Sequence, residues 1–347
     1  MSITAHERPG VYSDYIASSV VSGNAGRKRA GLAAQGIGGE ARTIGRYEEA
    51  AALDDATAAE MARLLLQNGA AQVVVFPVAG DTLADYQAAF AEMAAEEDLA
   101  AVLCDSTELT VQQALRQSVT DASAQQKERI AVVAGAAEET VSELVERAEA
   151  LNCERMVLAA PDCVDGEGEP CSGLPAAAAV AGVLAGQSDP AVPLGGAQVL
   201  GLYGLARRYS DSELDVLIRG GVTPLEHVSG SGYVVRGVTT RTKTEGVYDA
   251  TWRDLNAVLV ADDVIPAIRN SLKTRFRRAK NTPQSRGAIR SQVILELEAK
   301  KNAEIITRYG EVSVSADTQE PTRCLVDFSF TVTHGINQIW LSAQITV

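Results

Sequence analysis

Residues that could perform acid–base or nucleophilic chemistry are few and far apart in this 347-residue sequence. Such catalysis usually needs a histidine, or paired carboxylates, beside a nucleophile. The only histidines are His6, His227 and His334, and we interpret each as a surface or turn residue. Asp105-Ser106-Thr107 ends an apolar run, where α/β enzymes often place function, but the simpler interpretation is a helix N-cap. We therefore predict no catalytic residue.

Metal-binding patterns are also missing from the sequence. Asp162, Asp165, Glu167 and Glu169 share one loop, but their spacing does not match a calcium-binding loop, and we expect a solvated surface loop. The cysteines form no CxxC pair and are expected to be reduced thiols. They are Cys104, Cys153, Cys163, Cys171 and Cys324. The alternative is a small disulfide between Cys163 and Cys171, which flank the acidic loop.

Nucleotide binding is not indicated either. A dinucleotide fold needs a glycine-rich turn between its first strand and helix, so that a pyrophosphate reaches the helix N-terminus. Here Val73–Phe76 leads into Pro77–Asp81, which holds one glycine and an aspartate. Gly36-Ile37-Gly38-Gly39 follows no convincing strand, and no GxxxxGK[ST] motif occurs. No cofactor is predicted.

Basic residues cluster near the start of the C-terminal third. They are Arg269, Lys273, Arg275, Arg277, Arg278 and Lys280. On a helix Arg269, Lys273 and Arg277 would form a cationic edge, because residues four apart lie on the same face. Phosphate binding is one alternative, but no aromatic stacking platform or reading helix accompanies them. An acidic protein partner is the better interpretation, and no nucleic-acid partner is expected.

The charge distribution offers such a partner within the same protein. Residues 233–347 contain 16 Lys and Arg against 12 Asp and Glu, a net charge of +4. The remaining 232 residues hold the other 15 basic and 33 acidic groups, a net charge of −18. This asymmetry is compatible with self-association, in which the basic end of one subunit meets the acidic body of another.

Regular alternation of strand-like and helical patterns between about 46 and 225 predicts an α/β domain. Unbroken apolar runs predict strands at Gln72–Val78, Ala100–Asp105, Arg129–Ala134 and Glu154–Ala160. Amphipathic stretches predict helices near 56–68, 82–97, 108–124 and 138–151, and Pro175 opens an alanine-rich helix to Gly186. Thr57-x-x-Glu60 has the spacing of a capping box, and Asn68-Gly69 that of a helix stop.

The character of the sequence changes after a turn or short linker, Ser229–Gly232. Tyr233–Thr240 predicts a strand, Asp254–Lys280 one or two helices that could bend at Pro266, and Ser291–Ile306 a further helix. Period-two patterns predict strands at Cys324–Thr333 and Gln338–Val347. The predicted fold class is α/β, a central sheet flanked by helices, followed by an α+β C-terminal domain, with extended N- and C-terminal arms.

Four ranges follow from these patterns. They are an N-terminal arm (1–25), an α/β domain (26–228), an α+β domain (233–337) and a C-terminal strand (338–347). Residues 1–45 show no helical period and contain the strand-like Val11–Ile16. No run approaches the about 18 apolar residues that span a membrane, and the start lacks a signal-peptide pattern. We therefore expect synthesis in the cytoplasm and no membrane insertion.

Several segments of the sequence, taken in order along the chain, carry a resemblance to a known protein family. They are Glu7–Tyr12, Pro175–Gly186, Val235–Thr240, Asp249–Asn256, Val258, Asp262–Val264, Arg269, Asn281, Arg286–Ile289 and Ser291–Ile306. Together they resemble phage tail-sheath proteins, of contractile tails and of phage-tail-like bacteriocins. The resemblance covers both ends of the chain and the helix at 175–186, and it is weak over 46–170.

The resemblance implies a structural subunit and not an enzyme. Sheath subunits polymerise as stacked hexameric rings around an inner tube, contract to drive it through a target envelope, and meet baseplate and tail terminator proteins. Their arms add strands to neighbouring C-terminal domains, a form of β-augmentation. The arm residues implied here are Val11, Tyr12, Tyr15, Ile16, Trp340, Leu341, Ile345 and Val347. The resemblance also implies assembly into a tail particle made in a bacterial host. The open alternatives are an α/β enzyme and an anionic-ligand or nucleic-acid-binding module.

Overall fold

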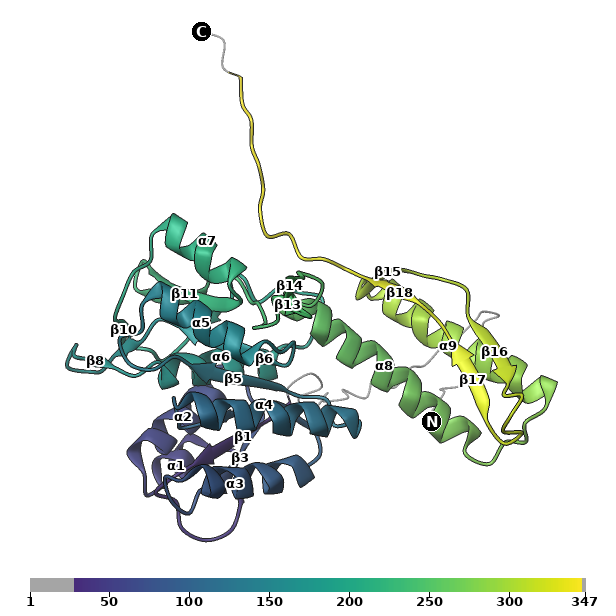
Figure 1. Cartoon of the computed structure of the whole chain (residues 1–347), viewed down its shortest axis with the longest axis horizontal. Coiled ribbons are helices and arrows are strands. Elements are labelled where there is room, and N and C mark those ends of the chain that lie inside the picture. Colours follow the sequence, from purple (N-terminus) through teal and green to yellow (C-terminus); the bar gives the residue numbers. More distant parts are fainter. Residues whose placement is uncertain (1–27, 345–347) are drawn as a thin grey trace, which may run out of the picture.

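The computed structural model of the chain describes residues 28–344 and contains two units joined by a long helix (Figure 1). An α/β unit holds a nine-stranded sheet, and a second unit combines two helices with a β ribbon. The last described residues extend away from both units. Of the predicted arm residues, Val11, Tyr12, Tyr15, Ile16, Ile345 and Val347 lie outside the described residues.

The nine-stranded sheet is mixed, with a parallel centre. From edge to edge its strands are β2 (Arg42–Ile44), β3 (Gln72–Pro77), β1 (Arg29–Ala34), β4 (Leu99–Cys104), β5 (Ile130–Ala134), β6 (Met156–Ala160), β11 (Val222–Val228), β12 (Ser231–Val234) and β9 (Gln198–Val199). Pairs from β3 to β11 are parallel, whereas β2, β12 and β9 pair antiparallel. The central strands are buried along almost their whole length, as a sheet covered on both faces requires. The predicted α/β class is confirmed.

Helices cover both faces of this sheet. One face carries α1 (Tyr47–Ala51), α2 (Ala56–Gln67) and α6 (Leu174–Gly186). The other carries α3 (Leu83–Ala95), α4 (Leu109–Ala124), α5 (Val141–Leu151) and α7 (Asp211–Arg219). The four helices predicted from amphipathic patterns are therefore confirmed, to within three residues at each end.

Strand β1, which lies between β3 and β4, was not predicted as a separate strand. Its residues, Ala30-Gly31-Leu32-Ala33-Ala34, lack the β-branched side chains that favour strands. Burial explains its small residues. A Cβ at Gly31 would lie 3.1 Å from Leu99 and 3.2 Å from Val102, so a larger side chain would crowd both neighbours. Packing and not propensity determines this strand.

The N-cap residues of two helices, α2 and α4, differ from the predicted ones. Asp55, not Thr57, begins α2, and its carboxylate accepts a hydrogen bond from Ala58 N at 2.8 Å. Glu108 is the N-cap residue of α4, so Asp105 does not cap that helix. The predicted stop of α2 is confirmed: Asn68 is its C-cap residue and Gly69 has a φ of +121°.

Glycines allow α2 and α6 to pack closely. A Cβ at Gly182 would lie 2.7 Å from Leu65 O and 2.7 Å from the Cβ of Asn68. At Gly186 it would lie 2.8 Å from the Cα of Gly69. Because these neighbours are mostly backbone atoms, they cannot turn aside, and the alanine-rich α6 sits directly on α2.

Gly182→Ala should therefore destabilise the fold, although alanine has the higher helix propensity. We expect the free energy of unfolding to fall by about 1–3 kcal/mol, the usual effect of overpacking. Chemical denaturation measures this. Gly287→Ala in α9 (Pro283–Asn302) is the matched control, because its added Cβ meets nothing within 4 Å, and it should stabilise or leave stability unchanged. Equal effects of both substitutions would contradict the packing argument.

Ser229–Gly232, expected as a turn or short linker, is a hairpin turn within the large sheet. Ser229 and Gly230 have φ values of 51° and 84°, as in a two-residue type I′ turn, and connect β11 to β12. The predicted strand at Tyr233–Thr240 ends at Val234. A second hairpin, β13 (Lys243–Thr244) with β14 (Val247–Tyr248), follows. The four predicted domain ranges, 1–25, 26–228, 233–337 and 338–347, stay predictions.

Two antiparallel helices and a β ribbon form the C-terminal unit. Helix α8 (Leu255–Phe276) runs through Pro266, and α9 begins eight residues before its predicted start, where Thr282 caps it and Pro283 takes the first position. The ribbon pairs β15 (Ile306–Tyr309) with β18 (Phe330–Val332), and β16 (Ser313–Ala316) with β17 (Cys324–Asp327). The strand predicted at Cys324–Thr333 is thus divided into β17 and β18. Alternate residues of it, Val326, Phe328, Phe330 and Val332, pack on the helices.

The predicted strand at Gln338–Val347 is not formed over its described part, 338–344. These residues extend into solvent, and Trp340 and Leu341 are 90% and 91% exposed. The physical reason is that a strand needs a hydrogen-bonding partner, and no described strand of the same chain lies beside this segment. The pattern is strand-like, but a single subunit does not pair it.

Candidate functional site

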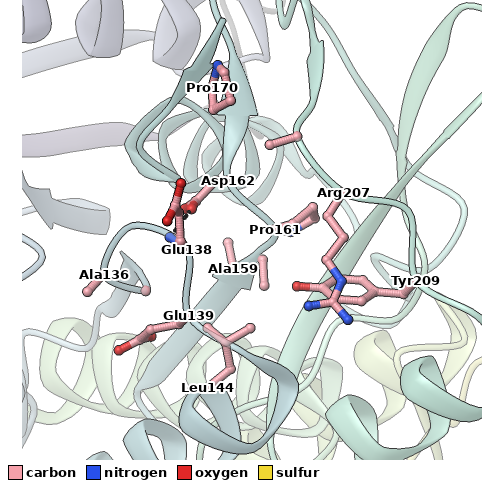
Figure 2. A pocket seen from close by; sticks show the side chains of 13 residues that line it. Ala136, Glu138, Glu139, Leu144, Ala159, Pro161, Asp162, Pro170, Arg207 and Tyr209 are labelled. Carbon is pink, nitrogen blue, oxygen red and sulfur yellow. Dashed lines mark hydrogen bonds between the residues drawn. The ribbon is translucent and has the colours of Figure 1, made fainter.

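The parallel sheet has a pocket at the carboxyl ends of β5 and β6, where α/β proteins often bind ligands (Figure 2). Its volume is about 270 Å³. Glu138, Glu139, Asp162, Arg207 and Tyr209 supply its polar lining. The small sheet formed by β10 (Gly204–Leu205), β7 (Cys163–Val164) and β8 (Pro170–Cys171) lies next to it.

The carboxylates of this pocket are held by the fold. Glu139 forms an ion pair with Arg147 at 2.6 Å, and Arg147 also donates to Thr107 O and to the side chain of Gln112. These bonds tie the ends of β4 and β5 together. Asp162 accepts a hydrogen bond from Glu138 N at 2.7 Å, and burial raises the pKa of Asp162. Asp162 is therefore partly buried where the loop begins, whereas Asp165, Glu167 and Glu169 are exposed, as expected of a solvated surface loop.

The chemistry of this pocket does not suit catalysis. None of its lining residues is a serine, cysteine, histidine or lysine. Burial raises the pKa of Tyr209 to about 12, so its phenol stays neutral and is a poor base. Arg207 is paired with Glu213. The negative charge that remains on the carboxylates of this pocket would repel a phosphate.

Asp105, which the sequence placed at a strand end, belongs to a structural network. Its carboxylate accepts hydrogen bonds from Gln35 N at 2.7 Å and from the hydroxyl of Tyr86 at 2.6 Å. Tyr86 in turn accepts a bond from the amide of Gln35. Burial raises the pKa of Asp105. The network braces the ends of β1 and β4 against α3.

The histidines and the acidic residues form no metal centre in residues 28–344. His227 and His334 are exposed, and His6 lies outside the described residues. The same part of the chain has no helix long and apolar enough to cross a membrane.

The predicted basic edge of α8 divides into two parts. Arg269 forms an ion pair with Glu128 at 2.9 Å, and Arg275 donates to the side chain of Gln292. Arg269 is therefore turned towards its own α/β unit, which corrects the expectation that all six cations face a partner. Lys273, Arg277, Arg278 and Lys280 are exposed, and no carboxylate in residues 28–344 lies within ion-pair distance of them.

Helix α8 is joined to the α/β unit by buried contacts that sequence reasoning missed. Arg155, beside β6, donates to both carboxylate oxygens of Asp262 at 2.6 and 2.8 Å. Both side chains are only 16% exposed. Arg236 also pairs with Asp254 at 2.7 Å, one residue before α8 begins. No spacing rule links residues 107 positions apart, so only the fold reveals the pair.

The β ribbon of the C-terminal unit has two open edges in the described chain. Each of its sheets contains two strands, so β15 and β16 leave one row of backbone groups unpaired and β17 and β18 leave another. Open edges of this kind bind further strands readily. The exposed segment after Thr333 has the apolar residues that such a strand needs: Ile336, Ile339, Trp340 and Leu341.

Comparison with known proteins matches both units. The phage tail sheath protein central domain matches residues 79–240, and the phage tail sheath C-terminal domain matches residues 248–346. A tail sheath protein of Bacillus phage SP01 is 31% identical over 220 residues, which is 60% of this chain and 36% of that protein. The chain thus spans about a third of the length of this relative.

Solved structures show the same fold. A chain of the sixfold-symmetrised anti-feeding prophage baseplate superposes with a TM-score of 0.74 at 16% identity, over 99% of this chain and 100% of that one. The sheath tail protein of Desulfitobacterium hafniense gives a TM-score of 0.70 at 11% identity, over 93% and 100%.

Proposed function

This chain belongs to the phage tail sheath protein family, and we propose that it is a sheath subunit of a contractile tail or injection system. The observation that carries the proposal is the combination of an exposed C-terminal segment with an open β ribbon on the same subunit. A segment that is strand-like in pattern, but unpaired in its own fold, is complementary to an edge that lacks a strand. The family is structural, and the pocket at β5 and β6 favours no enzyme.

In this proposal the C-terminal segment adds a strand to the ribbon of a neighbouring subunit. A strand of the length of 338–347 makes ~4–6 backbone hydrogen bonds, each stabilising the contact by ~0.5–1.5 kcal/mol net. Trp340 and Leu341, which are almost fully exposed, would be buried in the exchange. The N-terminal arm, Val11–Ile16, is proposed to occupy a second edge.

The partners follow from the same assembly. We propose helical stacks of hexameric rings around an inner tube, with baseplate and terminator proteins at the two ends, in a tail or tail-like particle. The sixfold baseplate chain with the same fold supports this arrangement. Strand exchange keeps subunits connected while rigid bodies change partners during contraction, which requires a metastable extended lattice.

Negative-stain electron microscopy of the purified chain, alone and co-expressed with its tail tube protein, tests this function. We expect hollow polymers with sixfold end views, at least when the tube is present to nucleate them. Absence of rings and polymers under both conditions would contradict the proposal.

The exposed cations at the end of α8 are proposed to contact the inner tube or the acidic α/β unit of a neighbour. Part of their clustering is explained within the helix, because cations near a C-terminus are favoured by its dipole. Four charges that have no ion-pair partner within residues 28–344, in a chain whose first 232 residues carry a net charge of −18, exceed that local need.

Reversing Arg277, Arg278 and Lys280 to glutamate should therefore weaken assembly at least tenfold, measured by sedimentation of polymers. The fold should be unchanged, because these side chains are exposed and form no side-chain hydrogen bond or ion pair within residues 28–344. Arg219→Glu on α7, an exposed charge in the α/β unit, is the control and should have little effect. Unchanged polymer yield in the triple variant would refute this contact.

A further inference from the structure

The small three-stranded sheet places two cysteines directly opposite each other. Strands β7 and β8 are antiparallel, and their register pairs Cys163 with Cys171. Side chains of directly opposed residues in such a pair lie on the same face of the sheet. Both thiols are free in the structure. From this juxtaposition we propose that Cys163 and Cys171 form a reversible disulfide under oxidising conditions.

The ladder supports a bond at this position. Asp165 N donates to Glu169 O at 2.9 Å, so that pair is hydrogen-bonded. Cys163 and Cys171 lie two positions further along each strand, and pairs alternate, so they are also a hydrogen-bonded pair with Cα atoms about 5.5 Å apart. Disulfides join Cα atoms that are about 4.4–6.8 Å apart. The backbone therefore already has the required separation.

Closing the bond needs only a small local movement. Cβ atoms in a directly opposed pair are ~4.5–5.5 Å apart, slightly more than the ~3.5–4.5 Å of a disulfide. Strand β8 has two residues and lies at the edge of its sheet, so it can shift towards β7 without disturbing the large sheet. A bond closed in this way is strained, and strained disulfides are the easily reduced ones. Reversibility follows.

The two thiols differ in access, which gives the reaction an order. Cys163 is 1% exposed, whereas Cys171 is half-buried. With a small-molecule disulfide such as oxidised glutathione, the Cys171 thiolate attacks one sulfur, forms a mixed disulfide and expels a thiolate. The Cys163 thiolate then attacks the Cys171 sulfur and expels the second thiolate. Two protein thiols are oxidised, and the oxidant disulfide is reduced to two thiols.

The reaction should be slow at neutral pH and faster in alkali. Burial raises the pKa of Cys163 to about 12. Burial also raises the pKa of Cys171, and the nearby carboxylates of Asp165, Asp162 and Glu60 raise it further. Because only thiolates attack, the oxidation rate should rise about tenfold per pH unit between pH 7 and 9. The bond would fasten the exposed acidic hairpin, 165–169, to the body of the subunit. This inference does not depend on the proposed sheath function.

Thiol counting on the full chain tests the proposal. The protein is incubated with oxidised glutathione at pH 8.5, quenched in acid, unfolded, alkylated and weighed as the intact chain. All five cysteines should be alkylated before oxidation and two fewer afterwards. A protease that cleaves after glutamate cuts after Glu167, between the two cysteines, so only a disulfide can hold the resulting peptides together.

Two matched variants identify which cysteines form the disulfide. Cys171→Ser should keep its four thiols alkylatable after oxidation, whereas Cys324→Ser should fall from four to two, as the wild type falls by two. Five alkylatable thiols in oxidised wild type, a glutathione adduct without cross-linked peptides, or a bond between other cysteines would each overturn the proposal. The wild-type result alone decides it if a variant does not fold.

Discussion

Deleting residues 338–347 should abolish polymerisation and leave the fold of the subunit unchanged. The described part of this segment contacts little of its own subunit, and Ile339, Trp340 and Leu341 are 84–91% exposed. Removing it therefore takes away almost no internal packing, but it removes the proposed exchange strand with its ~4–6 backbone hydrogen bonds. We expect polymers to disappear from electron micrographs and sedimentation, while circular dichroism and the Tm stay within about 1 °C of wild type.

A double substitution tests the contribution of the side chains of this segment separately from that of its backbone. Trp340→Ala with Leu341→Ala keeps the length of the segment but removes its two most exposed large apolar groups, and it should reduce polymer yield at least tenfold. Gln338→Ala with Ser342→Ala is the control, with similar polymer yield to wild type. Polymers that persist unchanged after the deletion would show that the C-terminal segment does not link subunits.

Removing the carboxylate of Asp262 should destabilise the subunit more than any surface substitution. Asp262→Ala leaves the guanidinium of Arg155 buried without its partner, and breaking a buried pair from one side typically lowers the free energy of unfolding by about 3–5 kcal/mol. Because the pair joins α8 to the α/β unit, we also expect protease cleavage near residues 240–254 to become faster. Denaturant titration and limited proteolysis measure the two effects.

Two comparisons test whether burial is the cause. Asp215→Ala on α7 removes a similar pair with Arg219, but these side chains are 68% and 74% exposed, and the loss should be below about 1 kcal/mol. Arg155→Met combined with Asp262→Leu removes both charges and should recover much of the stability lost by Asp262→Ala alone. If Asp262→Ala and Asp215→Ala had equal effects, Asp262 would not be a buried support for α8.

Elements whose sequence pattern reports burial directly could be predicted. The apolar run predicted at Arg129–Ala134 contains strand β5, which is buried on both faces. The period-two run predicted as one strand at Cys324–Thr333 contains β17 and β18, and its alternate apolar side chains pack on the helices. Strand β1 could not be predicted in full, since packing against its neighbours selects alanine and glycine there over β-formers. The early start of α9 was signalled by Thr282 and Pro283, a cap and first position that could have been recognised.

The predicted interaction residues depend on contacts that local pattern does not report. Trp340 and Leu341 are exposed in the structure, and their role as residues of an intersubunit strand stays a prediction. Arg269 was grouped with its helical neighbours, but its partner Glu128 is distant in sequence, so local spacing could not separate it from the exposed cations. For the same reason, local spacing could not predict the ion pair between Arg155 and Asp262. It also could not predict that Cys163 lies directly opposite Cys171, because that depends on strand register.

The central claim is that one subunit completes the β ribbon of another. A cryo-electron microscopy reconstruction of the polymer at side-chain resolution tests it most directly. The account predicts that residues 338–347 lie as a strand along an open edge of a neighbouring subunit's ribbon, with Trp340 buried there. A reconstruction in which this segment pairs with its own subunit's ribbon, or projects into solvent between subunits, would contradict it.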